Sequence, residues 1–137
     1  MDTKFYLCEV CGNVVVKVVD SGLNPFCCGR KMDELKPNTD DGAMGEKHVP
    51  SCKIEDHKLH VKIGTEPHPN TKEHHIEWIY VQTEHGSMMK YLNPDEAPEA
   101  CFKLSRDDCV ERVYAYCNLH GLWVCDCIKK CADKCDK

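Results

Sequence analysis

Cysteine and histidine are the residues of this sequence whose types and spacing could do chemistry. There are 12 cysteines and 8 histidines among 137 residues, and thiolate and imidazole are ligands that zinc and iron favour. In the stretch YAYCNLHGLWVCDC, Cys117 and His120 share one short turn and could reach the same metal ion. The pair could also be a nucleophile with its base, a redox pair or a coincidence, and the spacing alone leaves these alternatives open.

Three further histidines occur in segments that we expect to be loops or strand ends. They are His48 in GEKHVP, His68 in EPHPNT and His74 in KEHHIEW. Each histidine taken alone is more often a surface residue than a ligand. Together with the turn that carries Cys117 and His120, they make a possible set of five ligands for one ion.

A second group of thiols lies near the N-terminus. Cys8 and Cys11 form a C-x-x-C knuckle that can aim two sulfurs at one ion, and the adjacent pair Cys27 and Cys28 supplies two more. Adjacent cysteines normally point apart, so a tetrahedral ion bound by both would have distorted angles, which suits an iron whose geometry tunes its redox behaviour. The spacing predicts a four-sulfur metal site, with a disulfide among these cysteines as the alternative.

Composition and charge limit the class of protein. The net charge is −5 and no basic cluster is present, so we expect no nucleic-acid partner. No apolar run approaches the roughly 18 residues of a membrane span, and MDTKFYLCEV lacks the features of a signal peptide. We therefore expect no membrane association and a cytoplasmic location, where many cysteines indicate metal binding or redox chemistry rather than a disulfide scaffold.

The chain divides by pattern into three regions. Residues 1–36 form a small metal module, with strands on either side of the knuckle and Val14, Val16 and Val18 on one face. The polar stretch KPNTDDGAMGEKHVPS is a linker that enters a loop. Residues 37–124 are predicted to form an antiparallel β-sandwich, and residues 125–137 are a cysteine-rich tail.

Strand patterns support the sandwich. HKLHVKIG alternates strictly, which places Leu59, Val61 and Ile63 on a buried face. HHIEWIYVQTEHG reads as a longer and more buried strand, and CVERVYAYCNLHGLW as a final strand with its turn. The fold class is therefore mainly β.

These motifs, in type, order and spacing, resemble the desulfoferrodoxin family, the two-iron class of superoxide reductases. The resemblance rests on C-x-x-C, the Cys-Cys pair, GEKHVP, HPNTKEHHIEWI and YCNLHGLW, and it covers residues 1 to about 124. It implies a desulforedoxin-like N-terminal module followed by an immunoglobulin-like β-sandwich. It also implies two iron ions per chain, one bound by four cysteines and one by four histidines and a cysteine.

The resemblance assigns site residues one by one. The first iron would be bound by Cys8, Cys11, Cys27 and Cys28; the second by His48, His68, His74 and His120 in a plane, with Cys117 as the axial ligand. His75 stands where the family often has an aromatic residue.

Catalytic roles follow from the resemblance for two residues before His48. Lys47 would attract superoxide and position the water that donates protons. Glu46 would be the residue able to occupy the sixth position of the oxidised iron.

Seven cysteines remain outside these assignments: Cys52, Cys101, Cys109, Cys125, Cys127, Cys131 and Cys135. The last three are spaced by four, so a helical tail would place them on one face. The tail is a set of reduced thiols, a source of disulfides within itself or to Cys101 or Cys109, or a further metal site. We expect His57, His60 and His85 to be surface residues.

The sequence therefore predicts an iron-dependent superoxide reductase. Family resemblance implies that its substrate is superoxide, that reduced rubredoxin or a similar small protein donates the electron, and that two chains form a homodimer through their N-terminal modules. A non-catalytic electron-transfer or metal-binding protein on the same scaffold is the alternative, and a zinc-stabilised interaction domain is a third.

Overall fold

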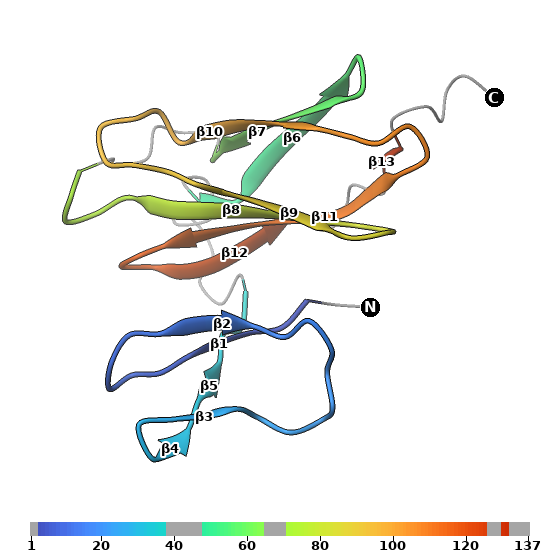
Figure 1. Ribbon diagram of the computed structural model, residues 1–137. Coiled ribbons are helices and arrows are strands. Elements are labelled where there is room, and N and C mark those ends of the chain that lie inside the picture. Colours follow the sequence, from blue (N-terminus) through green and yellow to red (C-terminus); the bar gives the residue numbers. More distant parts are fainter. Residues whose placement is uncertain (1–2, 38–47, 65–70, 126–129, 132–137) are drawn as a thin grey trace. The chain divides into compact units, whose positions relative to one another are not determined.

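The computed structural model of the chain describes residues 3–37, 48–64, 71–125 and 130–131, the last two by their backbone alone (Figure 1). The chain divides into two compact units, Met1–Lys36 and Pro37–Lys137. Among the described residues there is no helix with the length and apolar character needed to cross a lipid bilayer.

The N-terminal unit is built from short antiparallel strands. A three-stranded sheet has the order β2-β1-β5, with β1 at Phe5–Leu7, β2 at Val14–Val16 and β5 at Asp33–Glu34. Strands β3 (Phe26–Cys27) and β4 (Arg30–Lys31) form a separate hairpin.

The apolar core of this unit is very small. Tyr6, Cys8 and Met32 form its buried cluster, whereas Val18 is 92% exposed. The sequence prediction for Val18 was wrong, because β2 ends at Val16 and the following residues make a bend. So small a core gives little stability, and a bound metal would add folding free energy to this unit.

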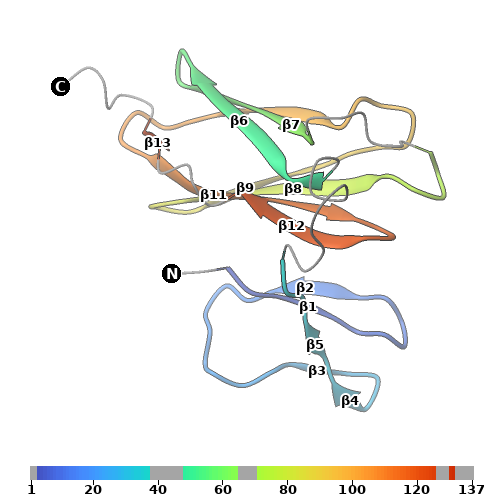
Figure 2. The ribbon, with the colours of Figure 1, turned by 180° about the vertical axis from the view of Figure 1, so that it is seen from behind.

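The second unit is an antiparallel sandwich of two sheets (Figures 1 and 2). One sheet has the order β10-β7-β6, from Glu99–Lys103, Lys58–Ile63 and Pro50–Glu55. The other has the order β12-β11-β8-β9, and β13 (Lys130–Cys131) pairs with β11. Its main strands are Gly121–Cys125 for β12, Cys109–Cys117 for β11, Ile76–Thr83 for β8 and Ser87–Tyr91 for β9.

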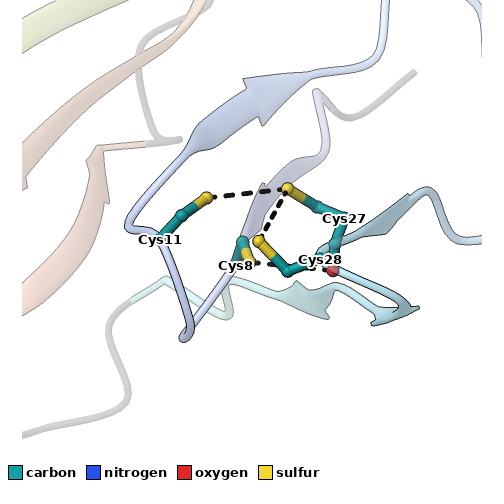
Figure 3. Close-up of side chains that lie close together, drawn as sticks. All are labelled: Cys8, Cys11, Cys27 and Cys28. Carbon is teal, nitrogen blue, oxygen red and sulfur yellow. Dashed lines mark hydrogen bonds between the residues drawn. The ribbon is translucent and has the colours of Figure 1, made fainter.

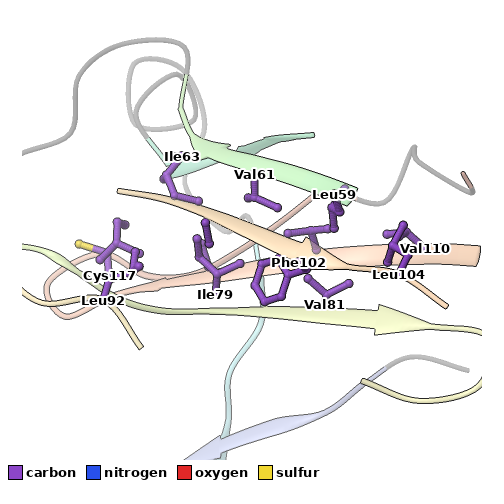
Figure 4. Close-up of a cluster of buried hydrophobic side chains, with 14 residues drawn as sticks. Leu59, Val61, Ile63, Ile79, Val81, Leu92, Phe102, Leu104, Val110 and Cys117 are labelled. Carbon is purple, nitrogen blue, oxygen red and sulfur yellow. The ribbon is translucent and has the colours of Figure 1, made fainter. Parts of the chain in front are cut away.

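Apolar side chains from both sheets fill the space between them (Figure 4). Leu59, Val61 and Ile63 of β7 are all buried while the residues between them are exposed, so the predicted alternation is confirmed. Phe102 of β10 and Ile79 of β8 belong to the same cluster.

Several strands were not predicted from the sequence. Pro50–Glu55 begins within the last two residues of the expected linker, Ser87–Tyr91 forms the edge of the larger sheet, and Gly121–Cys125 was predicted to be a turn. In the tail, Lys130–Cys131 forms a strand and not part of a helix. Their patterns are short or broken, and neighbouring strands decide their conformation.

The packing between the sheets predicts the effect of truncating Phe102, which is 6% exposed. Phe102→Ala is expected to lower the free energy of unfolding of the sandwich unit by about 3–5 kcal/mol, because it removes buried apolar contacts and leaves a cavity. Tyr91→Ala, at a side chain that is 73% exposed, is the matched control and should change it by less than about 0.5 kcal/mol. Urea unfolding of both variants measures the difference, and equal losses would contradict this packing.

Candidate metal centres

Four cysteine sulfurs converge in the N-terminal unit (Figure 3). All four sulfurs lie within 4.8 Å of one another. Cys27 Sγ is 3.6 Å from Cys11 Sγ and 3.9 Å from Cys28 Sγ. The structure therefore brings together the cysteines that the sequence grouped.

Local backbone conformation explains how adjacent cysteines face one point. Cys28 and Gly29 connect β3 to β4 as a two-residue turn, and both have positive φ, 54° and 74°. Positive φ at both positions is the pattern of a tight type I′ hairpin. On the other side, Gly12 with φ 85° ends the knuckle, and its N–H donates to the carbonyl of Cys8 over 2.8 Å.

The donor set fits a tetrahedral metal ion. Metal–sulfur bonds of roughly 2.3 Å in a tetrahedron place sulfurs about 3.8 Å apart, and the observed 3.6 and 3.9 Å lie on either side of that separation. The backbone N–H of Cys11 lowers the pKa of the Cys8 thiol to about 7. Interaction with Cys11 raises the pKa of Cys28 to about 12, so the thiols oppose joint ionisation and a cation would be needed to hold four thiolates.

A second group of donors lies in the sandwich unit, where β11 meets β12. His48, His74, Cys117 and His120 have ligand atoms that all lie within 4.8 Å of one another. Cys117 ends β11 and pairs with Gly121, the first residue of β12, so the turn between them carries His120. Gly121 has φ 82°, a conformation that glycine adopts without strain.

His48 and His120 approach closely. His48 Nε2 is 3.2 Å from His120 Nδ1, and their rings meet edge to face with centroids 4.9 Å apart. Cys117 Sγ is 3.7 Å from the same nitrogen of His120. Two imidazole nitrogens bound side by side to one ion at about 2.1 Å would lie about 3 Å apart. The geometry fits a shared metal ion.

Trp123 of β12 contacts both of these histidines, the ring of His48 and the backbone of His120. Its indole stacks on the ring of His48 with an interplanar angle of 17°, and its Nε1–H donates to the carbonyl of His120 over 3.2 Å. Trp123 is 1% exposed, as is His48. The indole therefore fixes the position of two donors from different segments.

His74 reaches the site from a segment that Asn118 holds. The Asn118 side chain accepts from the N–H of His75 over 3.0 Å and donates to the carbonyl of Glu73 over 2.8 Å. The N–H of Asn118 also donates to the carbonyl of His75 over 3.3 Å. These three hydrogen bonds clamp the residues on either side of His74 to the turn that carries His120.

Burial governs the chemistry of Cys117, whose side chain is fully buried. Loss of solvation raises the pKa of its thiol, although the backbone N–H groups of Leu119 and His120 favour the thiolate and lower it. A buried thiolate without a positive partner is unfavourable. A metal ion at the site would provide the positive charge and displace the proton.

Not every predicted site residue falls in the described part of the chain. Glu46, Lys47 and His68 lie outside the described residues, so their predicted roles stay predictions. His57, His60 and His85 are exposed, as expected. His85 forms a third group with Glu84 and Asp108 at the surface, and Asp108 Oδ1 lies 3.1 Å from His85 Nδ1.

Two residues that position the donors, Asn118 and Trp123, were not predicted from the sequence. Asn118 stands between Cys117 and His120 in the CNLH turn, and Trp123 follows three residues after His120. Their closeness to paired ligands was the available signal, since side chains in a ligand turn often orient the ligands.

Comparison with known proteins agrees with this arrangement. Residues 40–126 match the family model of desulfoferrodoxin. A desulfoferrodoxin from Syntrophotalea carbinolica is 41% identical over 119 residues, covering 86% of this chain and 91% of the relative. A superoxide reductase from Pyrococcus horikoshii is 40% identical over 99 residues, covering 58% of this chain and 84% of the relative.

A solved structure extends the likeness to the fold. The crystal structure of the superoxide reductase from Treponema pallidum is 31% identical, covers 90% of this chain and 97% of its own, and superposes with a TM-score of 0.76. The family model spans more than half of the chain, and the first relative matches over most of both lengths. The chain belongs to the desulfoferrodoxin family.

Proposed function

We propose that this protein is a superoxide reductase that reduces superoxide with one electron and two protons to hydrogen peroxide, without releasing oxygen. The observation that carries the proposal is the convergence of His48, His74, Cys117 and His120 within 4.8 Å, in a chain of the desulfoferrodoxin family. Relatives from Pyrococcus horikoshii and Treponema pallidum are named superoxide reductases.

Two sets of residues form two proposed iron sites. Cys8, Cys11, Cys27 and Cys28 would hold one iron, and His48, His74, His120 and Cys117 would hold the other, with His68 as the proposed fourth imidazole. Iron at the second site would supply the electron that superoxide receives. Cys117 is the one donor of this set that would be negatively charged, so a ferrous ion held there would keep a net positive charge.

Lys47 and Glu46 are the proposed catalytic side chains. The protein has a net charge of −5, which repels the superoxide anion on average, so a local positive charge is needed to attract it. Lys47 directly precedes His48 in the sequence and would supply that charge and position the proton-donating water. Glu46 would provide a carboxylate that competes with small ligands for the site.

An external electron donor is required for turnover, and we propose a small redox protein of the rubredoxin type. We also propose a cytoplasmic homodimer in which N-terminal modules pair. Exposed apolar side chains in that unit support such pairing, among them Val18, Val19, Leu23 and Phe26 at 71–92% exposure. Solitary exposed apolar residues are ordinary, but such a group in so small a unit is typical of an interface.

Metal analysis with electronic absorption tests the proposal against a non-catalytic carrier. The oxidised protein is expected to hold two irons per chain and to absorb in the red region from thiolate-to-iron charge transfer. It should consume superoxide only when a reductant is added. A colourless zinc protein, or one that leaves superoxide unchanged in the presence of reductant, would exclude the reductase.

The buried thiol gives the first prediction for this site. Cys117→Ser is expected to abolish the red absorption and slow superoxide reduction more than about a hundredfold, because even residues that only orient metal ligands matter by about 10–100-fold. Cys101→Ser, at an exposed thiol of the same unit, is the control and should keep both properties. Equal spectra for the two variants would remove Cys117 from the ligand set.

The clamp made by Asn118 gives a second prediction. Asn118→Ala removes the hydrogen bonds to Glu73 and His75 and should lower metal affinity or the rate with superoxide by about 10–100-fold. A shift in the red absorption band would report a displaced ligand, which a general loss of stability would not cause. Leu119→Ala, at a neighbour that is 62% exposed, should behave like the unmodified protein.

A third prediction concerns Lys47. Lys47→Ala should slow the second-order reaction with superoxide at least about tenfold and flatten its dependence on ionic strength, because the local attraction is lost. Lys53→Ala, at an exposed lysine of β6, controls for the change in net charge. Stopped-flow rates at several salt concentrations decide the matter, and parallel salt profiles for both variants would leave Lys47 without this role.

A further inference from the structure

Cys109, the first residue of β11, is disulfide-bonded. Eight other cysteines carry thiols and not disulfides: Cys8, Cys11, Cys27, Cys28, Cys52, Cys101, Cys117 and Cys125. The sequence contains 12 cysteines. The other three, Cys127, Cys131 and Cys135, lie in the tail, and of these the structure describes the backbone of Cys131.

The strand register places Cys131 beside Cys109. Strand β13 runs antiparallel to β11, with Cys131 opposite Cys109 and Lys130 opposite Val110. Residues directly opposite in an antiparallel pair have Cα atoms about 4.5–5.5 Å apart, within the roughly 4.4–6.8 Å that a disulfide spans.

The backbone around Cys109 is fixed from the sandwich side. Its N–H donates to Asp108 Oδ1 over 3.0 Å, and its carbonyl accepts from the N–H of Glu84 over 2.9 Å. The same carboxylate oxygen accepts from the N–H of His85 over 3.2 Å. In contrast, β13 has only two residues, fewer than a strand normally needs to stay paired. A covalent link is what would keep it in place.

We propose that Cys109 and Cys131 form a reversible disulfide latch that fastens the C-terminal tail to the end of β11, and that hydrogen peroxide forms it. One thiolate attacks the O–O bond of peroxide, becomes a sulfenic acid and releases hydroxide. The second thiol displaces the sulfenic oxygen as water, so two thiols are oxidised and one peroxide becomes two waters. A dithiol reverses the step by thiol–disulfide exchange.

The source of the oxidant rests on the proposed function, because hydrogen peroxide is the product that a superoxide reductase releases. Disulfide formation would then consume part of that hydrogen peroxide. The fraction of chains with the Cys109–Cys131 disulfide would depend on the peroxide concentration. The pairing of Cys109 with Cys131 does not depend on the enzyme's activity, so the two ideas can fail separately.

Peptide mapping of the full-length protein tests the pairing. Trypsin cuts after Arg106, Arg112, Lys129, Lys130 and Lys134. Cys109 then lies alone in peptide 107–112, Cys131 in 131–134, Cys135 in 135–137 and Cys127 in 113–129. Protein that has been reduced, freed of dithiol, exposed to added hydrogen peroxide and alkylated should yield peptide 107–112 linked to 131–134.

Two serine variants serve as a matched pair. Cys131→Ser should abolish the linked peptide, whereas Cys135→Ser should keep it. In the unmodified protein, oxidation should slow tryptic cleavage after Lys130 by about tenfold or more, because the cross-link opposes opening of the β13–β11 pair. Cys131→Ser should remove this difference between the oxidised and reduced forms.

The opposite results overturn the latch. Linkage of 107–112 to 113–129 or 135–137 would refute the pairing, and alkylated Cys109 after peroxide treatment would refute its formation by peroxide. Equal cleavage rates before and after oxidation would refute the fastening role. Superoxide reduction that persists in the same samples would leave the proposed function standing.

Discussion

The antiparallel register of β11 with its neighbours is the constraint on which the sandwich unit depends. Cys117 lies opposite Ile76 of β8 on one side and Gly121 of β12 on the other. A slip of one residue would turn every side chain of β11 to the other face of the sheet. Buried Val113 and Ala115 oppose such a slip, because both belong to the core between the sheets. The core therefore sets the position of the thiol that the metal site needs.

The two proposed metal centres differ in exposure, and this difference fits different tasks. Cys11 and Cys28 of the N-terminal site are exposed, so a protein electron donor can approach these sulfurs. Cys117 and His48 are buried, so small molecules can reach them more easily than a protein can. Burial also means that the thiolate depends on a cation for its stability, since solvation is lost. A metal ion at this site would therefore stabilise the buried thiolate as well as carry out the chemistry.

Much of the fold and site could be predicted from the sequence, for physical reasons that vary by element. Strict alternation gave the buried face of β7, and the clustering of thiol and imidazole types pointed to both metal groups. The short strand Gly121–Cys125 was missed, because its three consecutive buried residues lack alternation. Pairing with β11 determines its conformation. Asn118 was missed for a similar reason, since its hydrogen bonds to Glu73 and His75 join segments over 40 residues apart.

Strand β11 connects two kinds of cysteine chemistry at its opposite ends. Its nine residues run from Cys109 to Cys117, which separates the two cysteines by about 26 Å at roughly 3.3 Å per residue. That distance is too great for direct thiol exchange, so oxidation of Cys109 need not consume the thiolate proposed as a metal ligand. The central part of the strand is held by β8 and β12 on both sides. Formation or reduction of the disulfide would therefore affect β13, while the core keeps Cys117 in place. Strand β11 can thus carry a reversible thiol pair at one end without disturbing the metal site at the other.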